Sequence, residues 1–133
     1  MVILFDYDNL PEDVYLTVFA TEQQIVVAKM LVKTFKDAKG ELGKTEMSLF
    51  ANMLHDGVEI ETQQKQGFKQ MKSKEKFSYN KRQFYDRILT PMRAMGMIDY
   101  DIYRKKYKIS EKFNRGLQKI GLLWLQEVRK LQP

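Results

Sequence analysis

The chain of 133 residues contains no cysteine, three prolines and a single histidine. Without cysteine, disulfides, thiolate zinc sites and cysteine nucleophiles are excluded. No apolar run approaches the roughly 18 residues that a membrane span requires. The opening MVILF is too short for a signal peptide and lacks a basic leader. We therefore expect a cytoplasmic protein with no membrane segment.

Signatures of catalysis are also missing. There is no phosphate-binding glycine loop, nucleophile elbow or cluster of metal ligands. His55 is interpreted as the C-terminal cap of a helix. The strand-like VILF followed by Asp6 and Asp8 resembles the opening of haloacid-dehalogenase-type phosphatases and of PIN- and NYN-like nucleases, but the match ends within nine residues. We interpret Asp6, Asp8 and Asn9 as a turn before Pro11, and expect no enzyme activity, cofactor or metal.

The positive charge of the chain is concentrated in its second half. Residues 1–71 hold 7 Lys/Arg against 11 Asp/Glu, whereas residues 72–133 hold 16 against 6, so the net charge of +6 combines −4 and +10. Such a split indicates an electrostatic footprint on one part of the surface. A solvated lysine face is the alternative, and only the placement of the charges favours the first interpretation.

The pattern of apolar and capping residues predicts one α+β domain, mainly helical, with an arm and an added helix. Residues 1–20 are expected to form an N-terminal arm or strand, with a strand-like run at 2–5 and either a second short strand or an extended arm at 14–19. Residues 58–76 are polar and are expected to form a mobile loop or a polar surface helix. The expected elements are helices 21–38 (capped by Thr21), 45–55 (capped by Thr45), 79–95 (capped by Ser78) and 111–131 (capped by Ser110), and strands 97–103 and 107–110.

The third of these helices carries the functional prediction. On a helical wheel, one apolar arc contains Phe84, Ile88, Met92 and Met95. The opposite side presents Tyr79, Arg82, Gln83, Asp86, Thr90 and Arg93, with Arg87 on its flank. Arginine matches guanine edges or phosphates and glutamine matches adenine. Asp86 either accepts a hydrogen bond from cytosine or forms an i,i+4 salt bridge with Arg82. Pro91 is expected to kink the helix or to restart it with Thr90 as the cap.

The two strands that follow predict a basic hairpin with Arg104, Lys105 and Lys106 at or near its tip. Three neighbouring cations against phosphates would release counterions on binding. Tyr100, Tyr103 and Tyr107 lie between the cations, where they either support phosphate contacts or pack over the edge of the core. The alternative interpretation is that these charged residues protect an exposed strand edge from pairing with another chain.

With these features, the segment ILTPMRAMGMIDYDIYRKKYKIS resembles the winged helix-turn-helix family of DNA-binding proteins, including small archaeal, viral or plasmid regulators. The resemblance covers residues 21–110 and implies a winged helix whose third helix, 79–95, enters the major groove while the wing, 97–110, meets the backbone or minor groove. It departs from the family in the 22 residues from Gly57 to Ser78, an insertion that either covers the reading face or supplies Lys65, Lys69, Lys72, Lys74 and Lys76 as a phosphate-binding strap. The predicted DNA contacts are Tyr79, Lys81, Arg82, Gln83, Arg87, Arg93, Arg104, Lys105, Lys106 and Lys108.

The last segment, residues 111–133, predicts a helix that packs against another helix. Its apolar residues recur at steps of four, three, four, four and three: Phe113, Leu117, Ile120, Trp124, Val128 and Leu131. This stripe either forms a homodimer or folds back on its own domain. We therefore expect a homodimeric, nucleoid-associated transcriptional regulator that binds double-stranded DNA. The alternative is a winged-helix module that binds an acidic protein partner and no nucleic acid; RNA binding is a third possibility, disfavoured by the lack of a stacking platform.

Overall fold

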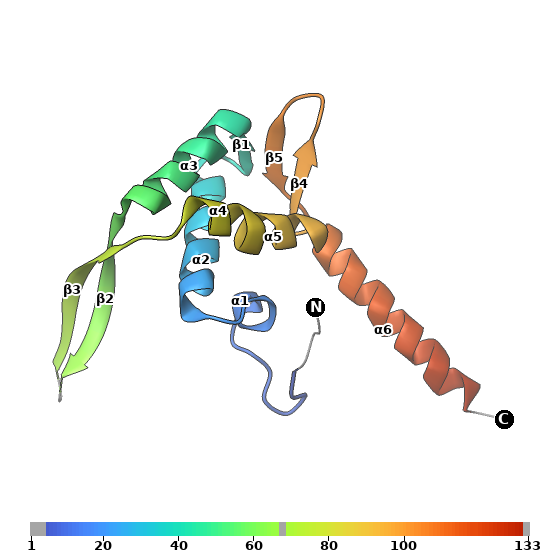
Figure 1. The fold of residues 1–133 in the computed structure, drawn as a ribbon. Helices are drawn as coiled ribbons and strands as arrows, with labels where there is room; N and C mark the ends of the chain where they lie inside the picture. The colour runs from blue at the N-terminus through green and yellow to red at the C-terminus, as the bar shows by residue number, and fades with distance from the viewer. Residues whose placement is uncertain (1–4, 67–68, 132–133) are drawn as a thin grey trace.

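The computed structural model describes residues 5–66 and 69–131, and within residues 61–74 it describes the backbone alone. It mixes helices with two small antiparallel sheets (Figure 1). The expected α+β class with a helical majority is confirmed. In chain order the elements are α1 (Val14–Val18), α2 (Glu22–Asp37), β1 (Glu41–Gly43), α3 (Lys44–Asp56), β2 (Val58–Gln66), β3 (Lys69–Phe77), α4 (Lys81–Phe84), the π-helical turn η1 (Tyr85–Leu89), α5 (Thr90–Ala94), β4 (Ile98–Asp101), β5 (Lys106–Ile109) and α6 (Lys112–Lys130).

One hydrophobic core lies between α2, α3 and the helical run α4–η1–α5. Thr21 caps α2 as predicted, because its hydroxyl accepts a hydrogen bond from the Gln24 amide. The buried residues of α2 recur at helical spacing and so form one face of the helix, and α3 contributes a second such face. The buried residues of these helices are Val27, Ala28, Leu31 and Phe35 in α2, Met47, Phe50, Ala51 and Leu54 in α3, and Phe84, Ile88, Leu89 and Met92 in the run that follows.

The larger sheet closes one side of this core. Its strand order is β1-β5-β4, so the short strand before α3 pairs with the second strand of the C-terminal hairpin. Leu42, Ile98 and Tyr107 are buried against the core. Since side chains alternate along a strand, the neighbours of Tyr107, Lys106 and Lys108, lie on the opposite, exposed face.

The run α4–η1–α5 forms the third helix. It begins at Lys81 with Asn80 as its cap, two residues later than predicted with Ser78, and the Asn80 side chain accepts from the Gln83 amide. At its centre the Thr90 amide bonds to the Tyr85 carbonyl, an i→i−5 turn placed just before Pro91. Thr90 keeps helical angles (φ −60°, ψ −48°), so the chain stays helical through Pro91, which lies in the first turn of α5.

Three other expectations were wrong. Residues 14–18 form the helix α1 rather than a strand, because the Asp13 carboxylate accepts from the Leu16 amide and caps a turn. Residues 58–77 form an antiparallel hairpin rather than a loop or a polar helix, with Val58 opposite Phe77 and Glu59 opposite Lys76. Helix α3 begins at Lys44 and not at Thr45, since the Glu46 side chain accepts from the Gly43 amide. The strand expected at residues 2–5 falls largely outside the described residues.

The turn at Asp6 is confirmed, with the Asn9 amide bonded to the Asp6 carbonyl and the Asp8 amide to the Asp6 carboxylate. Helix α6 matches its predicted bounds within a residue, and the Ser110 hydroxyl accepts from the Lys112 amide. It extends away from the rest of the molecule (Figure 1), and none of its 19 residues is buried. Among the described residues, no helix has both the length and the apolarity to cross a membrane.

Candidate nucleic-acid interface

The third helix turns a polar face to solvent. Arg82, Gln83, Arg87 and Thr90 are all exposed, while Phe84 and Ile88 point into the core. These exposed side chains come from successive turns of one helix, so they form a continuous surface. Arginine and glutamine on such a surface can donate to base edges and phosphates.

A carboxylate lies within this face. Asp86 Oδ2 is 3.8 Å from Arg82 Nε, and both side chains are exposed, so the predicted i,i+4 pair is confirmed as a contact. A pair this exposed contributes little to stability, about 0–1 kcal/mol. Its consequence is electrostatic, because Asp86 reduces the positive potential of the face.

Tyr79 does not belong to this face, and its prediction as a DNA contact was wrong. It precedes the helix and is buried in the core, with only 7% of its surface exposed. Its amide donates to the Leu54 carbonyl at 2.8 Å, which ties the hairpin exit to α3. Lys81 is half-buried, and its amide donates to His55 Nδ1 at 3.3 Å. His55 therefore links the end of α3 to the start of the third helix.

Arg93 connects the third helix to the β4–β5 hairpin. Its guanidinium carbon lies 5.2 Å from the centre of the Tyr100 ring and 5.8 Å from that of Tyr107. The centres of the two rings lie 4.5 Å apart and their planes are tilted by 39°, so the cation sits over a pair of contacting rings. Burial raises the pKa of Tyr107, and the nearby Arg93 opposes that shift. Two of the three wing tyrosines thus pack against the core edge, and Tyr103 remains exposed.

The hairpin turn, residues 102–105, has a fixed shape. The Asp101 carboxylate accepts from the amides of Tyr103 (3.0 Å) and Arg104 (3.2 Å), and Lys105 adopts a positive φ of 53°. The Arg104 guanidinium reaches both carboxylate oxygens of Glu41 at 3.4 Å, which ties the turn to β1. Arg104 and Lys105 lie at the turn as predicted, whereas Lys106 is the first residue of β5.

Carboxylates alternate with the cations on the exposed face of the sheet. Lys108 stands opposite Glu41 on one side and Asp99 on the other, and Lys106 stands opposite Asp101. The Lys112 ammonium, 2.9 Å from Asp99 Oδ2, lowers the pKa of Asp99, with a smaller contribution from Lys108. The wing is therefore less positive than its lysines alone indicate. Lys105 makes no ion pair within the described residues.

The inserted hairpin β2–β3 leaves the end of α3 and points away from the wing (Figure 1). It does not lie along β4–β5. Of the five lysines predicted to form a strap, Lys76 is exposed on β3, and the side chains of Lys65, Lys69, Lys72 and Lys74 lie outside the described residues.

The sequence-based reasoning missed the exposed apolar side chains of the turn. Ile102 is 74% and Tyr103 is 97% exposed. The sequence signal for them is Asp101 at the end of β4. An aspartate at the start of a turn favours an Asx turn, which leaves the residues that follow it exposed to solvent. The role of Glu41 was also missed, since its partner Arg104 lies 63 residues later.

Within the described part of the chain, no three His, Asp or Glu residues are grouped so that they could hold a metal ion. Comparison of the chain with protein-family models, with curated proteins and with solved structures finds no match.

Proposed function

We propose that this protein is a winged-helix DNA-binding protein that acts as a transcriptional regulator in the cytoplasm, associated with the nucleoid. In this proposal the third helix reads the major groove of double-stranded DNA and the β4–β5 hairpin is the wing. The dimer predicted from the sequence is part of the proposal, with α6 as the contact between copies.

The order of elements supports the proposal. A helix, a short strand, a second helix, a third helix and a two-stranded hairpin follow one another, and the short strand pairs with the hairpin in the order β1-β5-β4. This arrangement leaves one face of the third helix exposed beside the hairpin. The β2–β3 insertion lengthens the link before the third helix and points elsewhere.

The observation that carries the proposal is the position of Arg93. This residue ends the exposed face of the third helix and stacks on the wing tyrosines, so helix and wing form one continuous surface. A surface with a helix for the groove and cations for the phosphates suits a duplex. Arg82, Gln83 and Arg87 are the proposed base and phosphate contacts of the helix.

The carboxylates of the sheet determine which wing cations are free to bind phosphate. Arg104 is engaged by Glu41 and Lys108 stands between two acids, so each has a competing partner in the free protein. Lys105 at the turn has no such partner among the described residues. We therefore expect Lys105 to contribute more to phosphate binding than Arg104 does.

The experiment is a salt titration of duplex binding by fluorescence anisotropy. The test variant replaces Arg104, Lys105 and Lys106 by alanine. The control replaces three exposed lysines outside the wing, Lys33, Lys36 and Lys119, so that the net charge falls equally.

The slope of log K against log salt should lose about 2–3 units in the wing variant and change little in the control. Equal slopes in the two variants would remove the wing from the interface. Failure of the wild-type protein to bind any duplex at low salt would end the proposal as a whole.

One observation favours a second candidate, a protein-binding module. The wing combines alternating charges with the exposed Ile102 and Tyr103, which also suits a protein partner. This candidate predicts that Tyr103→Ala abolishes capture of a defined partner, while duplex DNA fails to bind even at low salt.

A further inference from the structure

Among the described residues, none covers the apolar face of α6 beyond its root. The six residues of its stripe lie on one side of the helix, and Trp124 is 70% and Leu131 84% exposed. Only Phe113, at the root, is half-buried. The opposite side carries Arg115, Lys119 and Arg129. An amphipathic helix with this spacing requires a second helix, because exposed leucine and tryptophan in a row are unfavourable in water.

The positions of the stripe residues are nearly symmetric about residue 122. In a side-by-side pair of antiparallel helices, position 113 of one copy meets 131 of the other, 117 meets 128, and 120 meets 124. Each layer then holds two apolar side chains of unlike size. A parallel pair would instead place the two Trp124 indoles in one layer. Gly121 stands next to the crossing point, and a Cβ built there would have nothing within 4 Å, so this part of the helix leaves room for the partner's indole.

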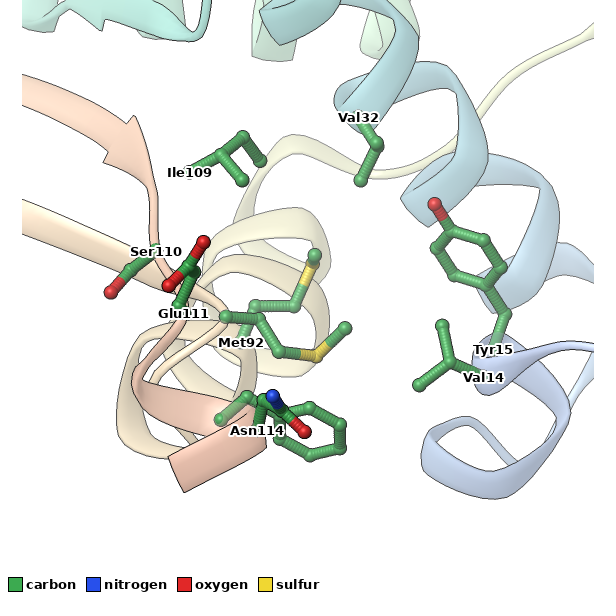
Figure 2. A pocket seen from close by; sticks show the side chains of 10 residues that line it. Val14, Tyr15, Val32, Met92, Ile109, Ser110, Glu111 and Asn114 are labelled. Atoms are coloured by element: carbon green, nitrogen blue, oxygen red, sulfur yellow. The ribbon is translucent and has the colours of Figure 1, made fainter. Parts of the chain in front are cut away.

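An apolar cleft of about 290 Å³ lies at the root of α6. Figure 2 shows Val14 and Tyr15 of α1 on one side of it and Met92 on the other. Phe113 lines the same cleft, so the cleft and the stripe form one surface. In an antiparallel pair the end of the partner's helix, with its exposed Leu131, arrives at this cleft. A parallel pair would leave both clefts unfilled.

The charges agree with this orientation. Arg129 and Lys130 occupy the last turn of α6, and Glu111 precedes its first turn and lines the cleft. Antiparallel packing places the last turn of each helix, where Lys130 lies, near Glu111 of its partner. The pair is about 28 Å long. A stable interface needs to bury at least about 1,000 Å², and the cleft adds to what the two helices alone bury.

We propose that two copies of this chain associate through α6 in an antiparallel pair, with the C-terminal turn of each helix seated in the root cleft of the other. This arrangement deepens the dimer of the proposed function and rests on it. It does not depend on DNA binding, so its test is carried out without DNA.

The absence of native cysteine makes disulfide mapping a direct test. In the antiparallel pair, Leu117→Cys combined with Val128→Cys brings unlike positions together, and mild oxidation should give a covalent dimer. Either single variant should stay uncrosslinked, because the two copies of position 117 lie about 15 Å apart along the axis, beyond the roughly 7 Å limit between Cα atoms of a disulfide. Lys119→Cys, on the polar face, is the control that should not crosslink.

Sedimentation equilibrium of the wild-type protein should give a dimer. Trp124→Glu should give a folded monomer with the helical circular-dichroism signal retained, because Trp124 is 70% exposed, and its melting temperature should no longer depend on protein concentration as that of the dimer does. A wild-type monomer, or a monomer that binds anionic vesicles or another protein through α6, would overturn the proposed pairing. Crosslinking by Leu117→Cys alone would show a parallel pair and overturn the antiparallel arrangement, while leaving the dimer and the DNA proposal standing.

Discussion

Replacing Gly96 by alanine tests how α6 is joined to the body. Gly96 lies between α5 and β4 with a φ of +85°, a conformation that side chains rarely adopt. Its carbonyl accepts from the Phe113 amide at 3.1 Å. A Cβ here would stand 2.7 Å from Lys112 Cβ and 2.9 Å from Phe113 N, so it would push against the backbone at the start of α6.

Two costs add at this position. The left-handed conformation costs an alanine about 1–2 kcal/mol, and forcing a methyl group against packed atoms costs about 1–3 kcal/mol more. Gly40 offers a matched control, because its φ is +89° and a Cβ there would have nothing within 4 Å. Gly40→Ala should therefore show the conformational cost alone.

The measurement is urea and thermal unfolding followed by circular dichroism. At roughly 4 °C per kcal/mol for a chain of this size, Gly40→Ala should lower the melting temperature by about 4–8 °C and Gly96→Ala by about 8–20 °C. Equal losses in the two variants would refute the close contact between Gly96 and α6. An unchanged Gly96→Ala variant would refute both arguments.

Three further substitutions test other parts of the structure. Phe84→Ala should cost about 3–5 kcal/mol in urea unfolding, since the ring is fully buried 5.4 Å from that of Phe50; a loss below about 1 kcal/mol would contradict the core. Asp86→Ala should tighten duplex binding and leave stability within about 0.5 kcal/mol, because it removes an exposed carboxylate from the reading face; weaker binding in anisotropy would count against that face. The hydrogen bond from Lys112 lowers the pKa of Asp99, so its stabilising effect is present above the unfolded pKa of about 4 and is lost as pH falls through the lower folded value. The urea midpoint of the wild type should accordingly exceed that of Asp99→Asn at pH 6, and this difference should shrink toward pH 2–3. A difference that stays constant with pH would disprove the stabilising role of the Asp99–Lys112 contact.

Much of the fold followed from caps and spacing in the sequence. Thr21 with Gln24 located the start of α2, and the apolar steps of α2, α3 and α6 predicted their helices, because local hydrogen bonds and amphipathicity act within a few residues. The β4–β5 hairpin was likewise predicted. The choice between folding back and extending away for α6 depended on tertiary contacts, and the sequence left it open.

The errors have physical causes. The helical wheel assumed 100° per residue through Pro91, but the π turn at Tyr85–Leu89 shifts the phase, so Leu89 is buried and Met95 only half-buried. Tyr79 was placed on the helix because the cap was assigned to Ser78 rather than Asn80. The β2–β3 hairpin has few apolar residues, so its pairing left a weak local signal.

The proposal that this chain binds DNA is tested most directly by selection from random duplexes with the wild-type protein, followed by a salt titration on the enriched sequence. We expect one motif to be enriched, with an affinity that falls by several orders of magnitude between about 50 and 200 mM salt. Absence of enrichment, together with no duplex binding at the lower salt concentration, would contradict the account.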